Sequence, residues 1–117
     1  MNDLTPVAVE QHIRELSTRI AKSASVCNER YSAYLTADRE FDQAFAQAFL
    51  DHDGAQGEKK YAAEVATTDE REARDIADAA YMYADRLAKA LQSELLAYQS
   101  INKSLLAQYQ VAGIGES

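Results

Sequence analysis

The stretch Leu50-Asp51-His52-Asp53-Gly54-Ala55-Gln56-Gly57-Glu58 decides the fold of this chain. It holds two of the four glycines among 117 residues, and it separates two long helical patterns. Aspartate and glycine favour turns, because aspartate caps the chain locally and glycine tolerates unusual backbone angles. We therefore predict one all-α domain over residues 1–117, a long antiparallel helical hairpin. Its parts are a helix over 6–50, a tip at 51–57, a helix over 58–110 and a flexible tail at 111–117.

The composition agrees with helices throughout. Ala, Glu, Gln, Leu, Arg and Lys dominate, while there is one proline and no tryptophan. These are the residues with the best helix propensities, and runs of Val, Ile and Thr typical of strands are lacking. Much of the apolar fraction is alanine, which buries little surface. The sequence therefore predicts a thin core.

The first helical pattern begins at Thr5-Pro6, where threonine can cap the helix and proline suits the first helical position. Apolar or small residues then recur in steps of three, four and seven, which places them on one stripe. A helix of this length is typical of a coiled coil. The stripe contains Val9, Ile13, Leu16, Ile20, Cys27, Tyr34, Phe41 and Ala44, with polar Ser23 and Arg30 weakening its middle.

The second helical pattern carries one internal start signal. Thr67-Thr68-Asp69-Glu70 resembles a capping box, in which a threonine and a glutamate three residues later satisfy free N–H groups. Either the helix restarts there after a kink, or these residues face solvent in a continuous helix. Gly113 and Gly115 predict the end of the helix. The expected apolar stripe comprises Val65, Ala73, Ile76, Ala80, Tyr83, Ala84, Leu87, Leu91, Leu95, Tyr98, Leu105 and Tyr109.

The two stripes predict a register for the hairpin. A turn near residue 55 makes the numbers of facing residues sum to about 110. Ile13 then faces Tyr98, and Tyr31 faces Ala80. The pairing fails at Phe41, which falls opposite Asp69 and Glu70, close to the possible kink.

The apolar side chains of residues 91–109 spread over a larger part of the helix surface than one partner helix can cover. Because two helices alone make a poor core, we predict a homodimer with a four-helix arrangement. The alternative is that Leu96 and Leu106 are isolated exposed leucines. The predicted dimer interface consists of Leu95, Leu96, Tyr98, Ile101, Leu105, Leu106 and Tyr109.

The net charge of −7 is concentrated in residues 51–79, which contain nine acids and four bases. This distribution disfavours binding to nucleic acid, which needs clustered Lys and Arg. The acidic block could meet a basic protein partner, or it could simply be a solvated surface. As a partner-binding face we name Glu64, Asp69, Glu70, Glu72 and Asp75.

No motif predicts catalysis, a metal or a cofactor. Asp51-His52-Asp53-Gly54 lacks the later ligands of a calcium loop, since Ala55, Gln56 and Ala62 occupy their places. His12 and Glu15 have the reverse order of the Glu-x-x-His motif of di-iron bundles, and such pairs are mostly surface charge links. The lone Cys27 lies on the apolar stripe, which favours a buried structural role. We therefore predict a non-enzymatic protein.

The start of the chain shows no signal peptide, and no apolar run is long enough to span a membrane. We therefore expect a cytoplasmic protein. Seven tyrosines could stack on nucleotide bases, but without a basic groove they favour core or interface roles.

The charged run Asp69-Glu70-Arg71-Glu72-Ala73-Arg74 and the later segment Leu95-Leu96-Ala97-Tyr98-Gln99-Ser100-Ile101-Asn102 resemble small proteins of phages of actinobacteria and related hosts. Those proteins look like helical hairpins encoded among replication and recombination genes, and mostly lack an assigned activity. The resemblance implies an accessory protein in the host cytoplasm. We expect an interaction protein in phage DNA metabolism. The alternatives are an acidic inhibitor of a host nucleic-acid machine, acting as a nucleic-acid mimic or in counter-defence, and a helper that binds single-stranded DNA.

Overall fold

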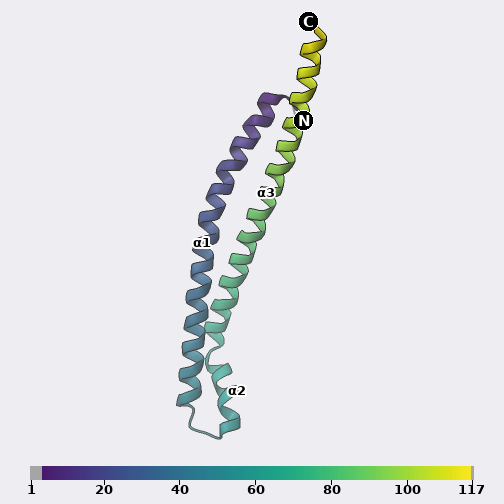
Figure 1. Cartoon of the computed structure of the whole chain (residues 1–117). Helices are drawn as coiled ribbons and strands as arrows, with labels where there is room; N and C mark the ends of the chain where they lie inside the picture. Colours follow the sequence, from purple (N-terminus) through teal and green to yellow (C-terminus); the bar gives the residue numbers. More distant parts are fainter. Residues whose placement is uncertain (1–3, 117) are drawn as a thin grey trace. The chain divides into compact units, whose positions relative to one another are not determined.

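The structure, a computed structural model, describes the backbone of residues 4–116 and the side chains of residues 4–113. It contains three helices, α1 (Pro6–Asp51), α2 (Gln56–Ala66) and α3 (Thr68–Glu116), and no strand in the described part (Figure 1). The all-α prediction is confirmed. Helix α1 begins where the sequence predicts, because Thr5 Oγ1 accepts a hydrogen bond of 3.2 Å from the Ala8 N–H.

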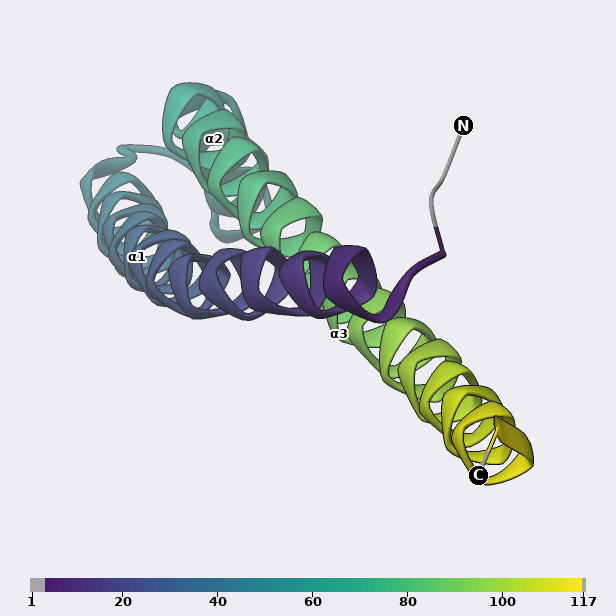
Figure 2. The same ribbon diagram turned by 90° about the horizontal axis from the view of Figure 1, so that it is seen from above.

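The chain divides into two compact units. Unit 1 combines residues 1–25 with 86–117, and unit 2 comprises residues 26–85. In unit 1, the start of α1 lies against α3, as both views show (Figures 1 and 2). In unit 2, the end of α1 faces α2 and the start of α3. Each unit is therefore built from antiparallel helical segments.

Ring contacts fix the register inside each unit. In unit 1, the His12 and Tyr98 rings stack with centroids 5.1 Å apart and planes inclined by 19°. In unit 2, the Tyr31 and Tyr81 rings lie 5.1 Å apart. Both pairs have residue numbers that sum to 110 or slightly more, so the described contacts follow the predicted register.

The tip closes around a histidine–glutamate contact. His52 Nε2 lies 3.6 Å from Glu58 Oε2 across the turn. A Cβ on Gly54 would lie only 2.6 Å from His52 Nε2 and 2.8 Å from Glu58 Oε2. Glycine thus leaves room for the ends of these two flexible side chains, while its φ is not positive. The tip is slightly shorter than predicted, because α1 includes Asp51 and α2 begins at Gln56.

Of the two alternatives for Thr67-Thr68-Asp69-Glu70, the structure has the restarted helix, because the second helix over 58–110 breaks at Thr67. This residue has φ −112° and ψ 24°, outside the helical region. Its hydroxyl donates to Ala63 O over 2.7 Å, and its N–H donates to the same oxygen over 3.1 Å. The hydroxyl therefore binds a carbonyl of α2 and does not cap the N–H of Glu70. Arg71 spans the break, since its Nη2 donates to Glu64 O over 2.7 Å.

The sequence predicts a tail from residue 111, whereas α3 continues to Glu116 in the described residues. Ser117 lies outside the described residues. Glycine ends a helix when it adopts positive φ. No described glycine does so, and both Gly113 and Gly115 lie within α3.

The core is thin, as the alanine content predicts. Its buried apolar side chains among the described residues are Val9, Leu16 and Leu91 in unit 1, and Ala63 and Ala84 in unit 2. The accessible surface of the chain is 8593 Å². A compact monomer of 13.0 kDa exposes about 6,300 Å². The chain thus leaves much more surface uncovered than a self-sufficient domain of its mass.

Candidate functional site

The first candidate surface is an exposed row on α3 in unit 2, which we call the outer stripe. Spacings of three, four and seven residues place its members on one helix face. Ile76 and Tyr83 are each 63% exposed although both are large and apolar. The outer stripe consists of Asp69, Glu72, Ile76, Ala79 and Tyr83, all exposed.

The outer stripe corrects the predicted direction of this part of α3. Ile76 and Tyr83 were expected to face α1, yet Ala84 is the member of the predicted stripe that is buried there. Val65, a member of the predicted stripe, is 77% exposed on α2. Ile76 and Tyr83 belong to the same continuous helix as Ala84 and lie about 80–100° from it around the helix axis. The predicted stripe was therefore wider than the face of α3 that is covered.

Most cations of unit 2 bind groups inside the unit. Arg30 Nη1 donates to Ala80 O over 3.2 Å, which places this polar member of the first stripe on a backbone carbonyl. Arg71 donates to Glu64 O. The Arg74 guanidinium carbon lies 4.4 Å from the Phe41 ring centroid, and Lys59 Nζ lies 5.9 Å from that of Phe49. Phe41, which had no apolar partner in the predicted register, is therefore covered by a cation.

This placement of the cations leaves carboxylates of unit 2 unpaired. Unit 2 contains fourteen acids and six bases, a net charge of −8, whereas unit 1 has a net charge of +1. Asp69 and Glu72 are exposed and form no ion pair with any described residue. Their position in or near the first turn of α3 stabilises the helix through its dipole.

The five predicted residues of the acidic face differ in exposure. Asp69, Glu72 and Asp75 are exposed, whereas Glu64 and Glu70 are half-buried. Asp75 Oδ1 accepts a contact of 3.3 Å from Arg74 Nη2. Glu70 lines an open hollow in unit 2 with Glu40, Gln43, Ala44, Ala46, Gln47 and Leu50.

The second candidate surface lies in unit 1, at the end of α3. Because His12 faces Tyr98, the first residue of α1 is level with about residue 104 of α3. Helix α3 continues well past that level, as Figure 1 shows at its yellow end. We call residues 105–113 the overhang. From Leu105 to Gly115 the sequence contains no Asp, Glu, Lys, Arg or His.

The predicted dimer residues divide between the two sides of α3. Leu95, Tyr98, Ile101 and Leu105 are half-buried, so they face the interior of unit 1 at least in part. Exposed members are Leu96 at 65%, Leu106 at 46% and Tyr109 at 57%. Val111, absent from the predicted interface, is 70% exposed on the overhang. The sequence could have revealed it through the lack of charge in this segment.

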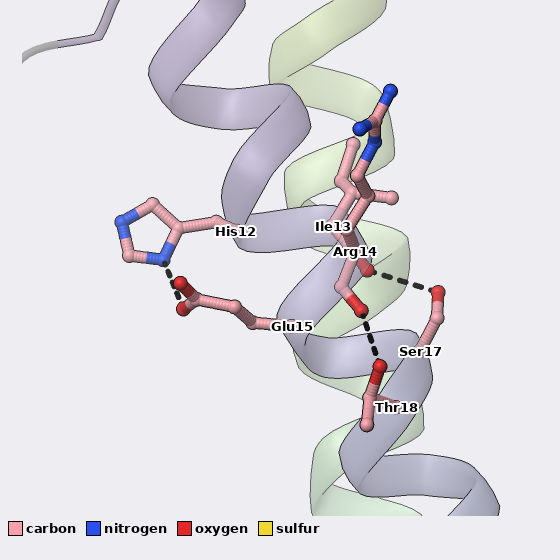
Figure 3. Close-up of polar contacts among 6 residues, drawn as sticks. All are labelled: His12, Ile13, Arg14, Glu15, Ser17 and Thr18. Atoms are coloured by element: carbon pink, nitrogen blue, oxygen red, sulfur yellow. Dashed lines mark hydrogen bonds and ion pairs between the residues drawn. The ribbon is translucent and has the colours of Figure 1, made fainter.

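The start of α1 carries only local polar contacts (Figure 3). His12 Nδ1 lies 4.0 Å from Glu15 Oε2, in the expected surface pair. Ser17 and Thr18 donate their hydroxyls to the carbonyls of Ile13 and Arg14, over 2.9 and 3.1 Å. These bonds bind helix hydroxyls to the helix itself and build no pocket for a ligand.

The other sequence candidates do not converge on a reactive site. No group of three potential metal ligands occurs within the described part of the chain. At the tip, Asp51 Oδ1 accepts a hydrogen bond of 2.8 Å from Gln47. Cys27 is half-buried, although a fully buried position was expected.

The tyrosines are also dispersed. Tyr31, Tyr81 and Tyr98 take part in ring contacts, while Tyr61, Tyr83 and Tyr109 are exposed on α2 or α3. No described helix is long and apolar enough to cross a membrane. Comparison of the sequence and structure with models of protein families, with curated proteins and with solved structures finds no match. The two surfaces therefore have to be interpreted from their own chemistry.

Proposed function

We propose that this chain is a non-catalytic interaction protein that binds a basic, amphipathic helix of another protein through the outer stripe of unit 2. The observation that carries the proposal is the opposite placement of charges in this unit. Arg30, Arg71 and Arg74 contact carbonyls and a ring, whereas Asp69 and Glu72 have no cation among the described residues. The carboxylates are thus free to meet cations of a partner.

The apolar members of the stripe define the form of the partner. Ile76 and Tyr83 lie seven residues apart on one face, a spacing that suits an apolar row on a second helix. Carboxylates beside them favour Lys or Arg flanking that row. Anionic membranes and nucleic acids carry the wrong charge for this surface, and a second unit 2 at −8 would be repelled.

The resemblance of residues 69–104 to phage accessory proteins supports a role among proteins of phage DNA replication or recombination, in the host cytoplasm. The free carboxylates favour a second candidate, an acidic inhibitor that occupies the basic nucleic-acid site of a host enzyme. A DNA competitor separates the two candidates. Duplex DNA would displace the inhibitor from such an enzyme, but it would leave a helix docked on the stripe in place.

The test uses a synthetic 21-residue helical peptide with a leucine row flanked by lysines, and a scrambled peptide of the same composition. Fluorescence anisotropy with the full chain should show at least about tenfold tighter binding of the ordered peptide. The double variant Ile76→Ser/Tyr83→Ser should lose that difference. Leu50→Ser is the matched control, because Leu50 is an equally exposed apolar residue of unit 2 outside the stripe. Equal binding of both peptides would refute the proposal.

A third possibility, binding of single-stranded DNA through tyrosines, has less support, because four of the six cations of unit 2 already contact internal groups. A gel shift with a single-stranded oligonucleotide at low salt tests it. A shift that persists in the Ile76→Ser/Tyr83→Ser variant would favour this function over the peptide-binding one.

A further inference from the structure

Within unit 1, the overhang of α3 extends past the start of α1. The start of α1 is level with about residue 104, so the last turns of α3 in unit 1 extend beyond that partner. The overhang continues an existing helix, so it needs no new nucleus, but helix extension in water adds little stability per residue. Gly113 and Gly115 lower its stability further, because glycine is a poor helix former. Packing against another helix would stabilise this segment.

The side chains of the overhang show what kind of surface is left uncovered. Leu106 and Tyr109 are three residues apart and therefore adjacent on one face. Both are exposed, and Val111, on a different side of the helix, is more exposed still. None of the residues from Leu105 to Gly115 carries a charge, in a chain where about one residue in four is charged. An exposed helix face that is apolar and uncharged is typical of an interface.

We infer that the overhang binds the overhang of a second copy of the chain, so that the protein is a homodimer joined through unit 1. A two-fold interface brings identical side chains together, which penalises any charge of one sign. The overhang avoids that penalty, and unit 1 as a whole has a net charge of only +1. The acidic unit 2 lacks this property.

A second copy would also cover surface that the chain leaves exposed. The chain exposes about 2,300 Å² more than a compact monomer of its mass, since its accessible surface is 8593 Å². Leu106, Tyr109 and Val111 of the overhang belong to that exposed surface. This inference uses residues of unit 1 alone, so it stands independently of the basic partner proposed for unit 2.

The first experiment measures mass. Light scattering on the full chain at about 1–100 μM should give twice the 13.0 kDa chain mass at the upper concentrations. The variant Leu106→Glu/Tyr109→Glu should give a single chain mass throughout this range, because two copies would bring four carboxylates together. Leu50→Glu, an exposed leucine of unit 2, should leave the dimer intact. Circular dichroism of both variants checks that residues outside the overhang remain helical.

The second experiment locates the contact. In a Cys27→Ser background, single cysteines at Leu106, Tyr109 and Gln110 are oxidised, and at least one should link two copies within the dimer. Cysteine at Leu50 should not. A parent chain that stays monomeric, or a dimer that survives Leu106→Glu/Tyr109→Glu, would overturn the inference. Loss of the dimer with peptide binding retained would support it and leave the function proposed for unit 2 unaffected.

Discussion

Arg74 lies over the face of Phe41, with its guanidinium carbon 4.4 Å from the centroid of the ring. The contact joins α3 to α1 in unit 2, at the position where the apolar register fails. A cation over an aromatic face contributes about 0.5–2 kcal/mol, depending on how much water is excluded. The arginine side chain also covers apolar surface with its methylene groups. A charged residue thus replaces an apolar one in the thin core of this unit.

We expect Arg74→Ala to lower the free energy of unfolding by about 1–2 kcal/mol, because both the ring contact and the packing are lost. Urea unfolding followed by circular dichroism measures this change. The matched control is Arg14→Ala in unit 1, where the exposed pair with Glu10 at 2.9 Å should contribute less than about 0.5 kcal/mol. Equal effects of the two substitutions would contradict a role for the Phe41 ring.

Thr67 and Thr68 make a second matched pair. Thr67 is 1% exposed and its hydroxyl binds Ala63 O, whereas Thr68 is exposed and its hydroxyl binds Val65 O over 2.9 Å. Thr67→Val should cost about 1–2 kcal/mol, since a buried hydrogen bond at the helix break is removed. Thr68→Val should cost under about 0.5 kcal/mol, because water replaces the lost bond. Chemical denaturation of both variants provides the comparison.

The glycines of the tip should respond with opposite signs. A Cβ at position 54 would collide with His52 Nε2 and Glu58 Oε2, the ends of two flexible side chains, so Gly54→Ala should separate this pair and destabilise the chain by less than about 1 kcal/mol. A Cβ at Gly57, inside α2, would meet no atom within 4 Å. Gly57→Ala should therefore stabilise by about 0.4–1 kcal/mol. Thermal unfolding of the two variants tests the difference, and the same sign for both would contradict the tip geometry.

Leu91 and Leu87 test which face of α3 is covered in unit 1. Leu91 is 5% exposed and Leu87 is 42% exposed. Leu91→Ala should lower the free energy of unfolding by about 2–4 kcal/mol, through lost burial and the cavity that remains. Leu87→Ala should cost less than about 1 kcal/mol. Both leucines belong to the apolar stripe of the sequence, so equal costs would mean that the stripe is buried uniformly.

The local features of the fold were predictable from the sequence. Thr5-Pro6 marks the start of α1, and the aspartates and glycines of residues 51–57 mark the tip, because capping and turn formation depend on neighbouring residues. The pairing of His12 with Tyr98 also follows from the position of the turn, because residues at equal distances along the chain from the tip face each other. Ile76 and Tyr83 could not be assigned correctly, because the apolar stripe is wider than one partner helix covers and its periodicity does not show which edge stays exposed.

The sequence by itself therefore determined that the chain is helical, that it turns back once near residue 55, and that acid is concentrated in residues 51–79. These properties depend on propensity, spacing and composition, which act over a few residues at a time. Only the tertiary structure decided which apolar residues stay exposed and which arginines contact carbonyls and rings. It also decided where α3 extends beyond α1 in unit 1. Those outcomes depend on the groups that lie across from each side chain, and helical periodicity carries no information about the opposite helix.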